Sequence, residues 1–317
     1  MKALIIGAAG FVGGYLINEL AAAGWEVHAT CLEGEKIKGE CTVHTLDVLS
    51  PESVKETLAA TAPDVVYHLA AQSSVSVSWK KPQLTAEVNV IGSINVLEAV
   101  RSAEKKDIRL ILIGSGEEYG YIRPGACPLS EEEALRPGNI YAATKACQGM
   151  LGEIYCKAYD MDIVMVRAFN HSGPAQSEIF VISDFCKQVA EIENGLKEPV
   201  MSVGNLEAMR DFTDVRDVVR AYRLLGEKGR KGNAYNVGRG NAVKIQFILD
   251  TIISYAEKHI TVQRDPKRMR ASDIPLIEPD VSKIYADTGW KAEISVEDTI
   301  KDTLDYWRAR IRSEHNV

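Results

Sequence analysis

The sequence predicts an α/β fold, namely a Rossmann-type doubly wound parallel sheet with a smaller C-terminal α/β lobe. Short apolar runs alternate with longer amphipathic stretches from the first residues onward, as strands alternate with helices. The apolar runs are continuous, which is expected when both faces of a parallel sheet are buried. The first run also leads straight into a glycine-rich turn, Gly7-Ala-Ala-Gly10-Phe-Val-Gly13.

The elements are expected in a regular order along the chain. Strands are predicted at 3–6, 26–30, 42–46, 65–69, 110–113 and 163–167. Helices are predicted after Phe11, after Pro51, over 82–103 and from about 139 to 159. After residue 170 we expect strands at 199–203 and 234–237, with helices after Asp214, Lys244 and Val296. We therefore assign residues 1–170 to the Rossmann domain, with later segments interleaved, and 171–317 mainly to the second lobe.

Composition excludes several classes of partner. The chain has 317 residues, 46% hydrophobic and 26% charged, which is typical of a soluble globular protein. A net charge of −7 argues against nucleic acid, and no apolar run reaches the length of a membrane span. Six cysteines without CxxC spacing indicate reduced thiols and no metal site. Because a strand begins at residue 2, leaving no room for a signal peptide, we expect a cytoplasmic protein.

The glycine turn is the first candidate site. Glycines allow a sharp turn and let the backbone approach a pyrophosphate at a helix N-terminus. The alternative is a tight turn that only packs the helix closely on its strand. Because the turn lies between a buried strand and a helix, we favour dinucleotide binding. The expected contacts come from Gly7, Gly10, Phe11, Val12 and Gly13.

The choice between NAD and NADP stays open. An acid after the second strand would bind the ribose diol, and an arginine would bind a 2′-phosphate. The run His28-Ala-Thr-Cys31-Leu-Glu33 offers neither in the expected place. After the third strand, Asp47-Val48 could bind the adenine, or Asp47 could cap the helix that begins near residue 51.

Tyr141 and Lys145 form the candidate catalytic pair. Their spacing of four places both side chains on one face of the predicted helix. A free tyrosine has a pKa of about 10, and a nearby ammonium would lower it toward neutrality. Ser115 ends an apolar strand and could bond the same substrate oxygen as Tyr141. A surface Tyr–Lys pair is the alternative, but the three residues together favour catalysis.

These motifs resemble the extended short-chain dehydrogenase/reductase family over essentially the whole chain. The resemblance rests on the glycine turn, His68-Leu-Ala-Ala71, Asn89-Val-x-Gly92-x-x-Asn95, Ser115 and Tyr141-x-x-x-Lys145. It implies that Tyr141 is the acid–base, that Lys145 also bonds the nicotinamide ribose, and that Ser115 orients the substrate. It further implies a homodimer packed through the tyrosine helix. On the cofactor side it places Leu69, Ala70, Ala71 and Asn89.

Other segments resemble the branch of this family that acts on GDP-mannose and its keto derivative. They are Ala71-Gln-Ser-Ser74-Val, Phe169-Asn-His-Ser-Gly-Pro174, the run from Val203 to Asp217, and Arg270-Ala-Ser-Asp273. The resemblance implies a GDP-sugar substrate. A guanidinium suits a diphosphate, although an ion pair of Arg210 with Asp211 or Asp214 is an alternative. The implied contacts are Gln72, Ser73, Ser74, Asn170, Arg210, Arg270 and Asp273.

The segment after the fifth predicted strand helps to distinguish a dehydratase from a reductase. Dehydration of the sugar needs an acid and a base beside the triad, and dehydratases of this branch carry Thr-Asp-Glu or Thr-Ser-Glu there. This chain has Ser115-Gly116-Glu117, so one position lacks a side chain, although Glu117 could still be a base. Reduction needs only a hydride from the cofactor and a proton from Tyr141.

We therefore expect NAD(P)-dependent reduction of GDP-4-keto-6-deoxy-D-mannose to GDP-D-rhamnose. A 4,6-dehydratase or a 4-epimerase on the same scaffold is the alternative. A dinucleotide-sensing regulator that has lost catalysis is disfavoured, because the Tyr141–Lys145 pair is intact.

Overall fold

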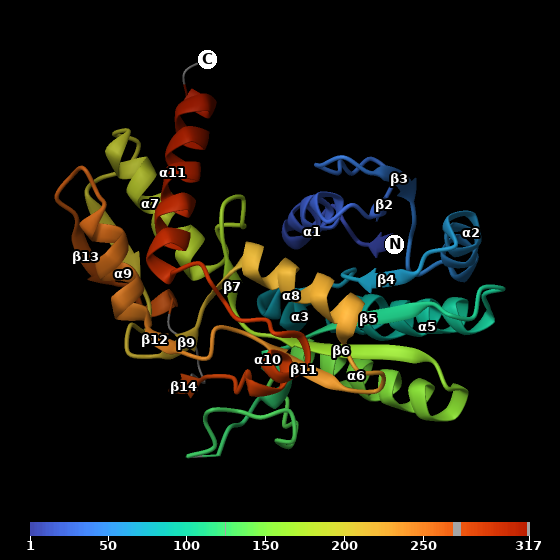
Figure 1. Ribbon diagram of the computed structural model, residues 1–317. Helices are drawn as coiled ribbons and strands as arrows, with labels where there is room; N and C mark the ends of the chain where they lie inside the picture. The colour runs from blue at the N-terminus through green and yellow to red at the C-terminus, as the bar shows by residue number, and fades with distance from the viewer. Residues whose placement is uncertain (124, 269–273, 316–317) are drawn as a thin grey trace.

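A seven-stranded parallel sheet forms the centre of the computed structural model, which describes residues 1–123, 125–268 and 274–315 (Figure 1). The strand order is β11-β6-β5-β4-β1-β2-β3, and every neighbouring pair is parallel. This confirms the predicted fold class. The order reverses at β1, so ligands are expected at the carboxyl ends of β1 and β4. The strands are β1 (Lys2–Ile6), β2 (Glu26–Cys31), β3 (Thr42–Thr45), β4 (Val65–His68), β5 (Arg109–Ser115), β6 (Asp162–Ala168) and β11 (Ala234–Val237).

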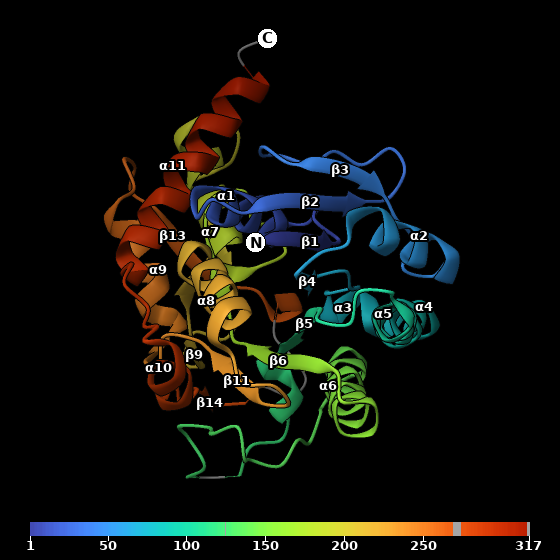
Figure 2. The same ribbon diagram turned by 45° about the vertical axis from the view of Figure 1, so that its right-hand side comes forward.

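Helices cover both faces of this sheet (Figures 1 and 2). In β1, Ala3 and Ile5 belong to one buried core, whereas Leu4 and Ile6 belong to the other. Burial on both faces explains why the apolar runs are continuous. On the face of Ala3 lie α1 (Phe11–Ala22) and α8 (Val215–Lys228); the other face carries α2 (Pro51–Thr61), α5 (Gly92–Ser102) and α6 (Ile140–Tyr159).

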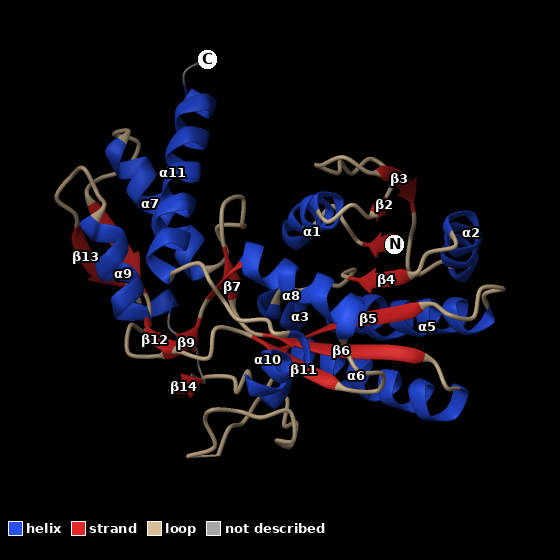
Figure 3. Cartoon of the chain, in the orientation of Figure 1, coloured by secondary structure: helices blue, strands red, loops and turns tan. Residues whose placement is uncertain are grey.

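The helix predicted over 82–103 is interrupted by a π-turn. It consists of α4 (Pro82–Ala86), the π-turn η1 (Glu87–Ile91) and α5, and it follows a short helix, α3 (Val75–Lys80), that the sequence did not reveal. Between the 3₁₀ turn η2 (Gly116–Tyr119) and α6 the chain forms a long loop (Figure 3). No helix among the described residues is both long and apolar enough to cross a bilayer.

The rest of the chain builds a second core and also returns to the main sheet. β11 pairs with β6, and α8 packs on α1. The helices are α7 (Val181–Glu193), α9 (Ile245–Ser254), α10 (Ser282–Thr288), α11 (Val296–His315) and the 3₁₀ turn η3 (Pro266–Arg268). The short strands are β7 (His171–Ser172), β8 (Val200–Val203), β9 (Met209–Asp211), β10 (Thr213–Asp214), β12 (Ala242–Lys244), β13 (Thr261–Arg264) and β14 (Leu276–Ile277).

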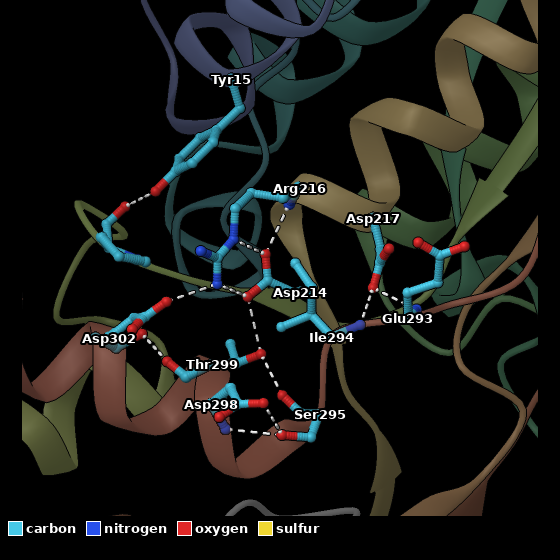
Figure 4. A network of polar contacts seen from close by, with 12 residues as sticks. Tyr15, Asp214, Arg216, Asp217, Glu293, Ile294, Ser295, Asp298, Thr299 and Asp302 are labelled. Carbon is cyan, nitrogen blue, oxygen red and sulfur yellow. Dashed lines mark hydrogen bonds and ion pairs between the residues drawn. The ribbon is translucent and has the colours of Figure 1, made fainter.

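A polar network fixes the second lobe against the Rossmann helices (Figure 4). Asp214 caps α8 and accepts two hydrogen bonds of 2.8 Å from the Arg216 guanidinium. From α11, Thr299 donates to the same carboxylate at 2.9 Å, and Asp302 binds Arg216 at 2.8 Å. Tyr15 of α1 donates to the backbone of the loop that follows β7. These contacts hold α1, α8 and α11 together beside the carboxyl ends of the strands.

Candidate active site

Two glycines of the turn after β1 are required by close packing. Gly7 has φ +86°, and a Cβ there would lie 2.6 Å from the backbone of Ala70. A Cβ on Gly13 would lie 2.1 Å from the carbonyl oxygen of Ala8. The Gly7 amide also donates to the Thr30 hydroxyl at 3.1 Å, which ties the turn to β2. At these two positions, close packing of the turn is enough to explain why the residue is glycine.

Gly10 lies in open space instead. A Cβ there would have no neighbour closer than 3.8 Å. Gly10 is the N-cap residue of α1, and no side chain caps this helix. Its first residues, Phe11 and Val12, therefore present backbone amides at the positive end of the helix dipole. This uncapped helix end fits the pyrophosphate of a dinucleotide.

The cofactor candidates that follow β4 lie against this turn, whereas Asp47 and Val48 follow β3. The amides of Leu69 and Ala70 both donate to the Ile6 carbonyl at 2.9 Å, which holds their loop against Gly7. Asp47 is exposed and accepts the Leu49 amide at 2.9 Å. The idea that Asp47 caps the next helix is wrong, because Ser50 caps it. Val48, in contrast, is buried.

Asn89 links the loop after β4 to α6 through hydrogen bonds. It is fully buried within the π-turn. Its Oδ1 accepts the Gln72 amide at 2.8 Å, and its Nδ2 donates to the Gln72 carbonyl at 3.1 Å and to the Thr144 hydroxyl at 2.9 Å. Both amide hydrogens are thus used to tie the loop after β4, which includes Ala71, to α6. In this structure Asn89 positions the site, rather than presenting a free amide to a cofactor.

Ser115 and Tyr141 are brought together as predicted. Ser115 ends β5 and is buried, while Tyr141 lies in the first turn of α6, which Asn139 caps through a 2.8 Å bond. Burial raises the pKa of Tyr141 to about 12; a hydrogen bond with Ser115 opposes this shift, and the charges of Glu118 and Glu117 add to it. Tyr141 is therefore protonated at neutral pH.

Lys145 does not have the predicted effect on Tyr141. Its Nζ donates to the Ile113 carbonyl at 2.7 Å and to Gln148 Oε1 at 3.0 Å. Burial lowers the pKa of Lys145 to about 8, and the ammonium is not among the groups that shift Tyr141. The expectation that Lys145 lowers the pKa of the phenol is therefore wrong for this arrangement. The two residues still share one face of α6 at the end of β5.

The segment after Ser115 leaves little room for a second acid–base pair. A Cβ on Gly116 would lie 3.0 Å from the ring of Phe169, so a side chain there would press against this ring. Glu117 is half-buried, and its Oε2 accepts a 3.1 Å hydrogen bond from Asn139. The sequence could not reveal that Phe169, directly after β6, packs closely against Gly116.

The substrate candidates lie in two places. Gln72, Ser73 and Ser74 follow β4, where Gln72 donates to the Ser74 carbonyl at 3.1 Å and Ser74 caps α3. Ser73 is exposed. Asn170 is also exposed, directly after β6. These four residues thus follow neighbouring parts of the sheet edge at which β5 places Ser115.

Arg210 lies in β9 of the second lobe. Its guanidinium donates to the carbonyls of Met209 at 2.8 Å and Ile274 at 2.7 Å. Arg270 and Asp273 lie outside the described residues, in the segment that immediately precedes Ile274. The alternative ion pairs of Arg210 do not occur among the described residues, where Asp211 accepts backbone amides of the loop after β11 and Asp214 binds Arg216.

An uncapped helix end at a glycine turn, beside a Ser–Tyr–Lys group, defines a dinucleotide-binding oxidoreductase of the Rossmann type. The chain belongs to the GDP-mannose 4,6 dehydratase family, to which residues 4–303 match. It is 31% identical to the GDP-6-deoxy-D-mannose reductase of Pseudomonas aeruginosa over 99% of both chains. It is 29% identical to GDP-mannose 4,6 dehydratase 2 of Arabidopsis thaliana, covering 96% of this chain and 86% of that protein.

Solved structures agree with this assignment. The structure of RMD from Pseudomonas aeruginosa complexed with NADPH superposes with a TM-score of 0.88 and 30% identity, covering 98% of this chain and all of that one. The UDP-glucose 4-epimerase of Thermus thermophilus in complex with NAD gives 0.86 and 29%, covering 97% and 99%. Neighbours with the same architecture thus carry NADPH or NAD.

Proposed function

We propose that this chain reduces a GDP-bound 4-keto-6-deoxy sugar with NADPH or NADH, converting GDP-4-keto-6-deoxy-D-mannose to GDP-D-rhamnose. The observation that carries the proposal is the protonated Tyr141 beside Ser115, together with the missing side chain at Gly116, which lies tightly against the Phe169 ring. Reduction needs a single proton donor at the sugar oxygen. A phenol with a pKa near 12 is in the donor state at neutral pH.

In this proposal each residue has one task. The bound dinucleotide supplies the hydride. The amides at the start of α1 bind its pyrophosphate, and the remaining N–H of Lys145 binds its ribose. Ser115 orients the keto oxygen, and Tyr141 gives its proton to that oxygen. Arg210 of the second lobe binds the diphosphate and nucleoside of the substrate. The other substrate contacts come from Asn170, Gln72, Ser73, Ser74, Arg270 and Asp273.

Dehydration fits the site less well. Expulsion of the 6-hydroxyl needs a base and an acid in addition to Tyr141. Position 116 offers no side chain, and Glu117 is bound to the N-cap residue Asn139.

The test compares two substrates with the purified protein. With GDP-4-keto-6-deoxy-D-mannose we expect one NADPH or NADH consumed per GDP-D-rhamnose formed, measured by cofactor absorbance and product chromatography. With GDP-mannose and no added reductant we expect no reaction. Formation of a keto sugar from GDP-mannose would show a dehydratase, and a C4 epimer formed without net cofactor consumption would show an epimerase. Inertness toward the keto sugar would overturn the proposal.

We also propose that the chain forms a homodimer through α6 and the helices beside it. Met150 and Ile154 of α6 are 52% and 56% exposed, and Leu84 of α4 and Ile91 of η1 are 39% and 49% exposed. α4 and η1 both pack on α6, so apolar side chains gather on this side of the molecule. Such exposed apolar groups are typical of interaction surfaces.

Ile154→Glu is expected to convert the dimer to a monomer without unfolding it. A buried carboxylate in the interface would face an apolar surface, and its desolvation would cost several kcal/mol. Light scattering after size-exclusion chromatography measures the mass. Tyr285→Glu is the control, because Tyr285 is 59% exposed on α10 and its replacement should leave the mass unchanged. A monomeric wild type would refute the dimer.

A further inference from the structure

Glu117 lies between the two elements that carry Ser115 and Tyr141. It is the second residue of η2, and its backbone amide donates to the Ser115 hydroxyl oxygen at 3.2 Å. The same hydroxyl makes the hydrogen bond with the Tyr141 phenol. Because Ser115 Oγ accepts from the Glu117 amide, its own hydrogen remains available for the phenol or for a substrate oxygen. Glu117 is therefore adjacent to the groups that would bind the keto oxygen.

Asn139 fixes the carboxylate of Glu117 from the side of α6. Its Oδ1 accepts the Ala142 amide at 2.8 Å and so caps the helix. Since a backbone amide can only donate, the side-chain amide of Asn139 has a single orientation, in which Nδ2 faces Glu117. This nitrogen donates to Glu117 Oε2 at 3.1 Å. Asn139 thus ties the turn after β5 to the helix that carries Tyr141.

The other oxygen of this carboxylate is left open. Among the described residues of the chain, none donates to Glu117 Oε1, and Glu117 is half-buried. Glu118 is oriented differently, since its Oε1 accepts the Ser115 amide at 2.7 Å. It occupies space left by Gly114 and Gly149, where a Cβ would lie 2.2 Å and 3.7 Å from its carboxyl oxygens. The turn therefore buries one carboxyl group and leaves the other as an acceptor beside the site.

The proposed substrate carries a hydroxyl that matches this acceptor. The keto carbon C4 lies between C5, which carries a methyl group, and C3, which carries a hydroxyl. When Ser115 and Tyr141 bind O4, the 3-hydroxyl is the nearest donor on the sugar. A carboxylate oxygen can only accept, and a hydrogen bond to a charged acceptor is stronger than one between neutral groups. The open oxygen of Glu117 thus suits the 3-hydroxyl.

We propose that Glu117, held by Asn139, accepts a hydrogen bond from the 3-hydroxyl of the keto sugar and thereby selects the face of C4 that receives the hydride. This assignment rests on the proposed reduction. Ser115 and Tyr141 hold only O4, and the single bonds that link the sugar to its diphosphate can rotate. With O4 alone held, the ring can present either face to the cofactor. A second contact at C3 prevents this rotation, so that one C4 configuration forms.

The reaction itself is unchanged by this contact. The cofactor gives a hydride to C4, Tyr141 gives a proton to O4, and Glu117 neither gives nor takes a proton. Glu117 is in this account a substrate-binding residue, and Asn139, which acts through it, is a positioning residue.

The principal test is Glu117→Met, which keeps a side chain of similar length and removes both oxygens. With the keto sugar we expect kcat/KM to fall about 10- to 100-fold, the range for a hydrogen bond to a charged group. We also expect the C4 epimer of GDP-D-rhamnose among the products, identified by chromatography and NMR. Glu132→Gln, which removes an exposed carboxylate from the following loop, should match the wild type in rate and product. Wild-type kcat/KM with a single product in Glu117→Met would overturn the assignment.

A keto sugar that lacks the 3-hydroxyl separates substrate binding from a structural role. The wild type should use this 3-deoxy analogue about as poorly as Glu117→Met uses the natural keto sugar, and the variant should not distinguish the two compounds. A structural defect would instead leave the variant with the wild-type preference for the natural compound, at a lower rate with both. That result would overturn the assignment.

Should Glu117→Met fail to fold, substitutions of Asn139 test the same contact. Serine and aspartate cap helices about as well as asparagine, so Asn139→Ser and Asn139→Asp are expected to keep α6 and the melting temperature unchanged. The serine variant releases Glu117, and the aspartate variant repels it. We expect KM for the keto sugar to rise about 3-fold and about 10-fold, respectively, with kcat little changed. Wild-type KM values in both variants would overturn the assignment.

Calorimetry with the product tests the contact without turnover. GDP-D-rhamnose also carries the 3-hydroxyl, so its Kd should be about tenfold higher for Glu117→Met than for the wild type. Equal Kd values would refute the contact with Glu117 even if the protein reduces the keto sugar. A wild type that shows the difference in Kd but is inert toward the keto sugar would instead refute the reduction.

Discussion

Replacing Tyr141 with Phe is expected to lower kcat for reduction of the keto sugar by about 10²- to 10⁴-fold, the usual contribution of a general acid. The phenol is the group that lies against Ser115 and is protonated at neutral pH. The Phe ring keeps the packing at the start of α6 but cannot donate a proton to the sugar oxygen. Affinity for NADPH should be nearly unchanged, since the helix end at Gly10 is untouched.

Steady-state oxidation of NADPH measures the loss, and fluorescence titration measures cofactor binding. Tyr159→Phe is the matched control, because Tyr159 ends the same helix and is 54% exposed. Turnover by the Tyr141 variant at the wild-type rate would exclude this phenol as the proton donor. Simultaneous loss of cofactor binding would instead mean that the hydroxyl supports the fold of the site.

The fold was predictable because its signals are local. The inner strands of the main sheet are short and buried on both faces, as Ala3 and Leu4 show by facing opposite cores. Such burial requires a continuous apolar run in the sequence. The edge strand β3, in contrast, is largely exposed. The meeting of Ser115 with Tyr141 was predictable for a similar reason. A strand end and a helix start that follow each other in a doubly wound sheet lie at the same edge.

The remaining features depend on contacts between residues far apart in the chain. The direction of Lys145 is set by the Ile113 carbonyl and Gln148, so spacing within α6 could not show that it leaves the pKa of Tyr141 high. From the sequence, Asn89 was expected to lie beside the cofactor, but its hydrogen-bond partners are the Gln72 backbone and Thr144. The burial of Glu118, next to the half-buried Glu117, likewise depends on space created by glycines of two elements.

A single methyl group on Gly13 is expected to disrupt the dinucleotide turn. The Cβ of an alanine there would lie 2.1 Å from the Ala8 carbonyl oxygen and 2.6 Å from its Cα, and backbone atoms of a tight turn cannot move aside cheaply. We expect a loss of about 3 kcal/mol or more in the free energy of unfolding, at the upper end of overpacking costs, together with loss of NADPH binding. Chemical denaturation and fluorescence titration measure the two effects.

Gly14→Ala is the matched control for Gly13→Ala. It adds the same methyl group one residue later in α1, where the nearest atom would be 3.6 Å away. Because alanine favours a helix over glycine by about 1 kcal/mol, this variant should be as stable as the wild type or more so, and it should bind NADPH normally. Equal behaviour of the two variants would show that the contact with Ala8 does not govern the turn.

Gly10→Ala is expected to separate binding from folding. Its methyl group meets no atom within 3.8 Å, so the free energy of unfolding should change by no more than about 1 kcal/mol, the cost of alanine at an N-cap. The same methyl group would project into the open space before the uncapped amides of Phe11 and Val12, where a pyrophosphate must approach. We expect the Kd for NADPH to rise at least about tenfold, equivalent to 1.4 kcal/mol. Unchanged affinity in a stable variant would place the dinucleotide away from this helix end.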